Sequence, residues 1–285
     1  MFSLWDIVSH DGDPIKIIDV GAMIIDNKPA DYHALLKPGV SKVVGFEPNE
    51  EECRKLNQSH SDDCLFLPYF IGSGSEHNFN MCNYNMTSSL YEPNIKLLEK
   101  FHTMSELNQV VERTTVRTKR LDDIEEVGGA DYLKIDVQGA EVDVFEGAAN
   151  LLAEIMIVHT EVEFIPLYID QPLFAEVDQA LRKSGFLFHK FHRHGMAGRA
   201  FKPLIINNDI NRPLSQILWA DAIYVKNFMD YDNMPAEKLL KLAVIMHDVY
   251  GSYDLVHYIL QHYDKKTKNK YAPQYLSLLC QNKPL

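Results

Sequence analysis

Runs rich in valine, isoleucine and aromatic residues alternate with amphipathic segments, and this alternation constrains the fold most strongly. The runs with the composition and length of strands are residues 16–20, 42–47, 64–71, 131–136, 155–163, 185–191 and 219–225. Apolar residues recur at helical spacing in residues 49–59, 139–152 and 173–185. Strands and helices in regular alternation predict a parallel sheet covered by helices on both faces.

Acidic residues lie at the ends of three of these runs. Asp19 closes the first run, Glu47 the second and Asp136 the fourth. Ligands of open α/β sheets bind outside the carboxyl ends of the strands, near the point where the strand order reverses. Each acid alone would also suit a helix cap or a solvated strand end. Because the three acids are expected to share one edge, the sequence predicts a binding site there.

The sequence of the turn after the first run helps to decide which nucleotide ligand this site could bind. A dinucleotide site requires Gly-x-Gly-x-x-Gly, so that a pyrophosphate can approach a helix N-terminus. Here Gly21 is followed by Ala22 and Met23, with no second glycine through Ile25. S-adenosylmethionine has a ribose and an adenine but no phosphate, and the carboxylate of Glu47 can accept both ribose hydroxyls. The turn favours this methyl donor, and an NAD(P)-dependent sugar oxidoreductase is the alternative.

The charge balance and the cysteines exclude several classes of protein. Lys and Arg total 28 and Asp and Glu total 40, which gives a formal net charge of −12. An acidic molecule repels polyanions, so we expect no nucleic-acid partner. The cysteines form no Cys-x-x-Cys pair, and no apolar run reaches the roughly 18 residues that a membrane helix needs. We expect a soluble, cytoplasmic protein with reduced thiols and no membrane partner.

Several motifs occur in an order typical of one family. They are DVGA at 19–22, GFEPN at 45–49, FIGSGSE at 70–76, NMTSSLYEPN at 85–94, KRLDDI at 119–124, YLKIDVQGAEVDVFEGA at 132–148 and TEVEFIPLY at 160–168. Over roughly residues 15 to 226, the chain resembles the FkbM-type S-adenosylmethionine-dependent methyltransferases. The resemblance implies a class I methyltransferase fold, an α/β fold with a seven-stranded, mostly parallel sheet. It also implies methyl transfer to a hydroxyl of a sugar or a secondary metabolite.

The resemblance also implies a set of cofactor-binding residues. They are Asp19, Gly21 and Ala22 for the methionine end of the donor, Glu47 for the ribose, and Ile71 and Gly72 for the adenine. A polar loop that contains Ser88 would fold over the donor, and Asp136 would hold its amino group or share in catalysis. Met23 and Ile25 stand where the family turn has an asparagine and a glycine. This departure leaves a catalytically silent binding module as a further alternative.

Candidate catalytic side chains gather on the fifth run. The two-residue period of a strand places His159, Glu161 and Glu163 on one face. Transfer to oxygen requires a group that removes the acceptor's proton, and we expect one of these three residues or Asp136 to do so. Lys134 is expected to form a buried ion pair with an acid. The clustered carboxylates could instead hold a divalent cation, but the sequence does not favour a metal site.

A histidine-rich stretch follows the sixth strand-like run. Its histidines are His189, His192 and His194, and they lack the acidic partners and the spacing of a familiar zinc site. We therefore expect an exposed or substrate-facing loop here rather than a metal centre.

The last part of the chain has a different, helical pattern. The predicted division is a methyltransferase domain at 1–228 and a helical extension at 229–285. Two amphipathic helices separated at Gly251 and a short third helix are expected in the extension. Their apolar stripes would pack on the core or on a second subunit, which would make a homodimer. A small molecule or saccharide is the expected methyl acceptor.

Overall fold

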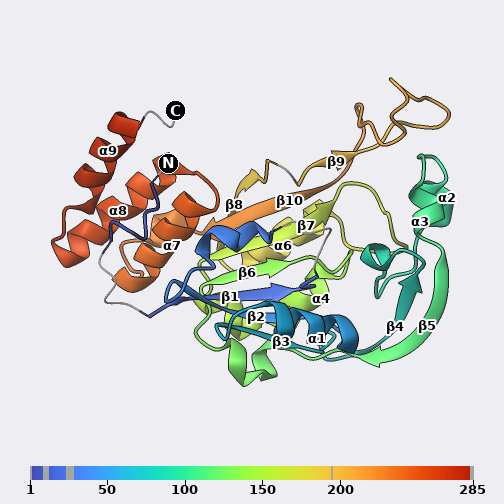
Figure 1. Ribbon diagram of the computed structural model, residues 1–285, viewed down its shortest axis with the longest axis horizontal. Helices are drawn as coiled ribbons and strands as arrows, with labels where there is room; N and C mark the ends of the chain where they lie inside the picture. The colour runs from blue at the N-terminus through green and yellow to red at the C-terminus, as the bar shows by residue number, and fades with distance from the viewer. Residues whose placement is uncertain (1, 9–12, 24–28, 194, 283–285) are drawn as a thin grey trace.

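A central, mostly parallel sheet organises the protein (Figure 1). The computed structural model describes residues 2–8, 13–23, 29–193 and 195–282. The strands of the sheet are β1 (Ile15–Val20), β2 (Ser41–Phe46), β3 (Cys64–Leu67), β6 (Tyr132–Ile135), β7 (Ile157–Glu163), β8 (Phe186–Phe191), β9 (Ala197–Gly198) and β10 (Ile217–Lys226). Each predicted strand is present, and the one predicted for 64–71 ends earlier than expected, at Leu67.

The order and direction of the strands confirm the fold class that the resemblance implies. The order is β3-β2-β1-β6-β7-β10-β8, with β9 paired to β10. Neighbours from β3 to β7 are parallel, whereas β10 is antiparallel to both β7 and β8. The strand order reverses at β1, because β2 and β3 lie on one side of it and β6 and β7 on the other. A ligand of such a sheet is expected at the carboxyl end of β1.

Helices cover both faces of the sheet (Figure 1). On one face lie η1 (Asp31–Leu35), α1 (Glu50–Ser59) and the C-terminal helices, and on the other lie α4 (Glu141–Glu146), α5 (Ala149–Glu154) and α6 (Phe174–Lys183). The helix predicted for 139–152 is two helices, interrupted at Gly147. The backbone of Gly147 packs so closely on Gly72 that an added Cβ would lie 2.0 Å from the Gly72 carbonyl oxygen.

Apolar side chains of the helices and of the strands form one buried layer on each face of the sheet.

The first full helix, α1, fixes the turn that follows β2. The side chain of Asn49 caps the helix by accepting two backbone N–H groups of the first turn. Leu56 packs with Phe66 of β3 and with Ala22, the second residue after β1. These contacts tie the segment that contains Glu47 to the ends of three strands.

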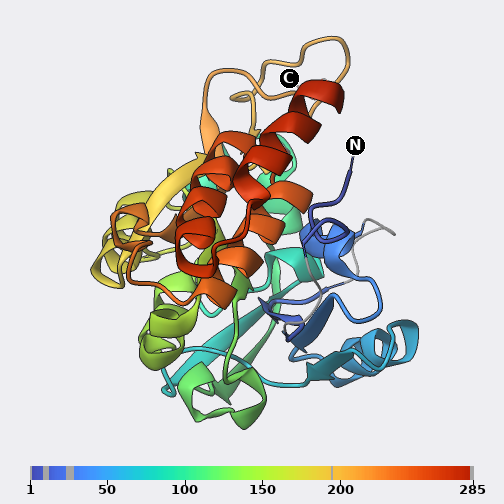
Figure 2. The ribbon, with the colours of Figure 1, turned by 90° about the vertical axis from the view of Figure 1, so that its left-hand side faces the viewer.

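The three C-terminal helices form a layer at one end of the molecule (Figure 2). They are α7 (Ala236–Asp248), α8 (Tyr253–Thr267) and α9 (Tyr271–Asn282). Leu239 and Ile259 are fully buried in the same cluster as Ile17 and Ile157 of the sheet. The apolar stripes thus pack on the core, and a dimer through these helices stays a prediction. None of the helices within the described ranges has the length and apolar content to cross a bilayer.

An arm that the sequence did not predict projects from the sheet between β3 and β6 (Figure 1). It is an antiparallel ribbon of β4 (Glu76–Cys82) and β5 (Val110–Arg117), separate from the central sheet. The short elements of the arm and of the later connections are η2 (Asn85–Thr87), α2 (Ile95–Leu98), α3 (Met104–Leu107), η3 (Leu121–Asp123), η4 (Glu125–Val127) and η5 (Phe228–Asp230). The arm carries the polar loop that was expected to cover the donor.

Candidate functional site

Gly21 begins the turn after β1 in a conformation that favours glycine. Its φ is +82°, and an added Cβ would lie 1.9 Å from the carbonyl oxygen of Asp136. The N–H groups of Gly21 and Ala22 both donate to the carbonyl of Phe46, at 3.1 and 3.0 Å. The turn therefore holds the ends of β1 and β2 against the residue that follows β6.

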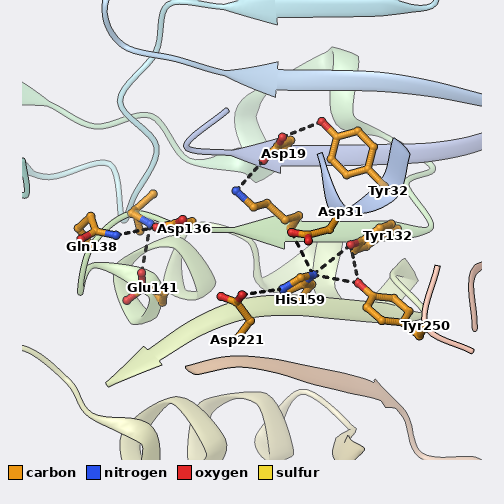
Figure 3. A network of polar contacts seen from close by, with 12 residues as sticks. Asp19, Asp31, Tyr32, Tyr132, Asp136, Gln138, Glu141, His159, Asp221 and Tyr250 are labelled. Atoms are coloured by element: carbon orange, nitrogen blue, oxygen red, sulfur yellow. Dashed lines mark hydrogen bonds and ion pairs between the residues drawn. The ribbon is translucent and has the colours of Figure 1, made fainter. Parts of the chain in front are cut away.

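Asp19 belongs to a buried polar network on the sheet (Figure 3). Its Oδ2 accepts a hydrogen bond from the Tyr32 hydroxyl at 2.7 Å, and its Oδ1 lies 3.4 Å from Lys134 Nζ. Burial alone lowers the pKa of Lys134, but attraction to Asp19 and to other acids outweighs it and leaves this pKa raised. The expected buried ion pair of Lys134 is confirmed. Contact of Asp19 with the methionine end of a donor stays a prediction.

Glu47 follows β2 directly and is buried, with 5% of its surface exposed. Its Oε1 accepts the backbone N–H of Asn49 at 2.8 Å, and no described residue donates to its Oε2. Burial raises the pKa of Glu47 to about 7, although the Asn49 N–H opposes the shift. A carboxylate with a spare oxygen at this strand tip can accept ribose hydroxyls.

Gln138 links Asp136, which follows β6, to Glu161 of β7, and the sequence reasoning missed it. Figure 3 shows its contact with Asp136. Its Nε2 donates to Asp136 Oδ1 at 2.8 Å and to Glu161 Oε2 at 2.9 Å. Its Oε1 accepts from the Tyr168 hydroxyl at 3.0 Å. Gln138 has a left-handed φ of 55°, which a sequence pattern for strands and helices does not reveal. The one available signal was its place beside Gly139 in the motif at 132–148.

Three glutamates close to Gln138 are buried, and each has a raised pKa. Burial raises the pKa of Glu161 and of Glu163, and repulsion from neighbouring carboxylates raises both further. The pKa of Glu141 is also raised, mainly by burial. Within the described part of the chain, Glu163 Oε2 and Glu141 Oε2 have no hydrogen-bond partner. A carboxyl with a raised pKa is a stronger base once ionised, so an ionised member of this group can accept a proton from a substrate.

The polar loop after β4 reaches these acids through the two neighbours of Ser88. Ser89 Oγ donates to the Gln138 carbonyl at 2.6 Å, and the Thr87 carbonyl accepts from the Tyr168 hydroxyl at 3.1 Å. Ser88 Oγ itself accepts the backbone N–H of Cys82 at 3.0 Å. Ser88 thus shapes the loop, and its contact with a donor stays a prediction.

Ile71 and Gly72, expected near the adenine, lie on the scaffold beside the arm. Ile71 is buried in the core cluster that also contains Phe46. The N–H of Gly72 donates to the Lys119 carbonyl at 3.0 Å, and the atoms nearest an added Cβ belong to Thr118, at 3.0–3.1 Å. The structure places no other predicted site residue in contact with them, so their role stays a prediction.

His159 lies in a second polar network, deeper along β7 (Figure 3). Its Nδ1 is 3.0 Å from the Tyr250 hydroxyl and 3.4 Å from the Tyr132 hydroxyl. Asp31 approaches the same nitrogen to 3.9 Å, and Asp221 approaches Nε2 to 3.9 Å. His159 therefore has polar partners of its own, two residues before Glu161 along β7.

His189 and His192 do not lie in an exposed loop. His189 Nε2 is 2.9 Å from Ser252 Oγ, and burial lowers its pKa. The side chain of His192 is 18% exposed, and its ring centre lies 5.4 Å from that of His159. An exposed loop is wrong for both residues, because β8 extends to Phe191 and brings them against the sheet and the C-terminal helices. His194 and Ile25 lie outside the described residues.

The strand order and the acids at the carboxyl ends of β2, β6 and β7 define a class I methyltransferase scaffold. A family model described as the methyltransferase FkbM domain matches residues 6–188, which include Glu47, Gln138 and Glu161. The chain belongs to the FkbM methyltransferase family.

Several solved structures are similar to this chain at low identity. The FkbM methyltransferase from Methylobacillus flagellatus KT is 13% identical over 75% of this chain and 44% of its own, with a TM-score of 0.40. Magnesium protoporphyrin IX methyltransferase (ChlM) from Synechocystis PCC 6803, with bound SAM, is 10% identical over 75% of this chain and 71% of its own, with a TM-score of 0.38. The N-terminal domain of EvdMO1, with SAH bound, is 8% identical over 75% of each chain, with a TM-score of 0.35. No curated protein matches the sequence.

Proposed function

We propose that this protein transfers the methyl group of S-adenosylmethionine to a hydroxyl oxygen of a saccharide or another small molecule. The observation that carries the proposal is the pair of acidic positions at the strand ends. One buried carboxylate, Glu47, stands at the tip of β2 beside the Gly21 turn, and a group of proton-accepting carboxyls stands at the ends of β6 and β7. The first suits a ribose and the second suits a hydroxyl acceptor.

The donor side of the proposal rests on Glu47 and the Gly21 turn. An ionised carboxylate accepts two O–H donors, and Glu47 has one oxygen that no described residue uses. Gly21 packs directly on the Asp136 carbonyl, and this contact holds the turn at the strand ends where the donor would bind. The donor supplies a sulfonium-bound methyl group, and the acids nearby suit its positive charge.

The acceptor side rests on Glu161. In the proposed reaction the acceptor oxygen forms a bond to the methyl carbon while the bond from that carbon to sulfur breaks, and the hydroxyl proton passes to a base. Glu161 is the most exposed of the buried glutamates close to Gln138, at 8%, and Gln138 holds its Oε2 in place. Its raised pKa makes its ionised form a stronger base than an exposed carboxylate. Asp136 shares the same amide and positions the pair.

Isothermal titration with S-adenosylhomocysteine and with NAD⁺ tests the donor. We expect S-adenosylhomocysteine to bind in the micromolar range and NAD⁺ not to bind. Glu47→Gln should weaken binding by about 10-fold or more, because a charged hydrogen bond contributes about 1.5–3 kcal/mol. Glu51→Gln is the matched control, since the Glu51 side chain is 66% exposed on α1, and it should bind as the wild type does. Binding of NAD⁺ instead would support the oxidoreductase alternative.

Turnover tests the acceptor class and separates an enzyme from a silent binding module. With a labelled methyl donor and a panel of saccharides and small hydroxyl compounds, we expect label to appear in a hydroxyl-bearing acceptor. Binding of S-adenosylhomocysteine without transfer to any member of a broad panel would favour the binding module.

A further inference from the structure

Two histidines and an aspartate from three different strands meet beside the proposed acceptor site. His159 of β7, His192 after β8 and Asp221 of β10 each offer a ligand atom, and these atoms lie within 4.8 Å of one another. We propose that these three side chains bind a divalent transition-metal ion such as Zn²⁺. No part of the proposed methyl-transfer site described above uses this group of residues.

The contacts of His159 show why a cation belongs there. Nδ1 is occupied by the Tyr250 hydroxyl at 3.0 Å. Nε2 faces Asp221 Oδ2 at 3.9 Å, which is too long for a hydrogen bond, and no other described residue bonds to it. The side chain of His159 is 2% exposed and that of Asp221 is 25% exposed, so a buried imidazole nitrogen faces a carboxylate that an ion can reach from solvent. A cation between the two would satisfy both lone-pair donors.

The spacing suits a metal ion. Nitrogen and oxygen ligands lie about 2.1 Å from Zn²⁺, so two ligands of a tetrahedral site are separated by about 3.4 Å. The 3.9 Å between His159 Nε2 and Asp221 Oδ2 exceeds this separation by about 0.5 Å. The limit of 4.8 Å for the whole group means that closure around an ion shortens the distance between any two ligand atoms by at most about 1.4 Å.

Backbone hydrogen bonds hold His192 and Asp221 in register. The His192 N–H donates to the Asp221 carbonyl at 2.8 Å, and the Asp221 N–H donates to the Gly195 carbonyl at 3.2 Å. A Cβ at Gly195 would lie 1.9 Å from Asp221 Oδ2, so the glycine leaves the space in which this carboxylate lies. The loop after β8 therefore positions both ligands before any ion binds.

Outer contacts of the kind that support metal-binding histidines surround the group (Figure 3). A ligating histidine usually donates its other ring N–H to a carboxylate or another polar group. Tyr250 and Asp31 stand on the Nδ1 side of His159, at 3.0 and 3.9 Å. Asp31 also lies 3.9 Å from His192 Nδ1. One carboxylate outside the group thus faces both imidazoles.

The ligand set also indicates the class of metal and its use. Two imidazoles and one carboxylate suit Zn²⁺ and other first-row divalent ions, whereas Mg²⁺ and Ca²⁺ prefer oxygen ligands. Three protein ligands leave a coordination position open for an oxygen atom.

Asp221 is directly opposite Glu161 in the ladder of β7 and β10. If the proposed methyl transfer holds, an acceptor hydroxyl bound to the ion would have a lowered pKa beside Glu161.

Metal titration of the tag-free, full-length protein tests the proposal. After EDTA treatment and dialysis, we expect one Zn²⁺ per chain by calorimetry, and Co²⁺ to give the visible absorption of a site with nitrogen and oxygen ligands. Asp221→Asn and His192→Ala should each weaken Zn²⁺ binding at least 10-fold. His189→Ala is the matched control, because His189 lies in β8 shortly before His192 but bonds to Ser252, and it should bind Zn²⁺ as the wild type does.

Several outcomes would overturn the metal site. They are no Zn²⁺ binding below millimolar concentration, unchanged binding in Asp221→Asn, and tighter binding of Mg²⁺ than of Zn²⁺. Thermal unfolding of each metal-free variant checks that it folds, and Zn²⁺ should raise the melting temperature of the wild type but not of Asp221→Asn. Titration with S-adenosylhomocysteine in EDTA reports on the donor site alone, so a failure of the proposed function and a failure of the metal site give different results.

Discussion

Substitution of Gly21 by alanine should destabilise the protein far more than a glycine substitution at an open turn. Gly21 has a φ of +82°, and the added Cβ would lie 1.9 Å from the Asp136 carbonyl oxygen. The left-handed conformation costs a residue with a side chain about 1–2 kcal/mol. Forcing the backbone after β6 to move adds about 1–3 kcal/mol. We therefore expect the free energy of unfolding to fall by about 2–5 kcal/mol.

Gly39→Ala provides the control for this prediction. Gly39 has a similar φ of +76°, but nothing lies within 4 Å of an added Cβ, so it should show only the conformational cost of about 1–2 kcal/mol. Urea unfolding at equilibrium measures both variants. The difference between them isolates the close approach of β1 to the residue after β6. Equal losses in the two variants, within about 0.5 kcal/mol, would refute the reasoning.

Three further perturbations test the site. Lys134→Met leaves the Asp19 carboxylate buried without its cation and should lower the free energy of unfolding in urea by about 3–5 kcal/mol. Lys55→Met removes an exposed ion pair and should lower it by under about 1 kcal/mol. Similar losses in the two variants would contradict this expectation. Because the pKa of Glu47 is raised in the folded protein, its protonated form stabilises the fold relative to its ionised form. This stabilisation is fully present below the unfolded pKa near 4.5 and is lost as pH rises through about 7. Glu47→Gln should flatten the unfolding free energy over that range, and an unchanged pH slope would count against the buried carboxyl. Glu161→Gln should lower kcat by about 10²–10⁴-fold with donor affinity unchanged, as single-turnover transfer would show; full activity would exclude Glu161 as the base.

The central sheet could be predicted because its strands are buried and apolar. The runs that became β1, β2 and β7 are rich in valine and isoleucine, and their burial on both faces removes any need for alternation. The ribbon of β4 and β5 escaped prediction because six of the eight residues of β5 are exposed and its burial does not alternate. Pairing between its two strands, rather than a core, defines this arm.

The sequence could predict only those residues of the candidate site that lie at the ends of strands. Asp19, Glu47 and Asp136 could be placed from strand boundaries alone. Gln138 could not, because its contacts depend on a left-handed backbone conformation. The group of His159, His192 and Asp221 depends on β10 lying between β7 and β8, an order that no local spacing encodes.

A crystal structure of the protein with S-adenosylhomocysteine tests the central claim most directly. The claim is that the ends of β1 and β2 hold a nucleoside without phosphate. We expect the ribose hydroxyls within about 3 Å of the Glu47 carboxylate and the amino-acid end of the ligand at the Gly21 turn. A ligand bound elsewhere, or a Glu47 side chain that contacts only the backbone of Asn49, would contradict the account.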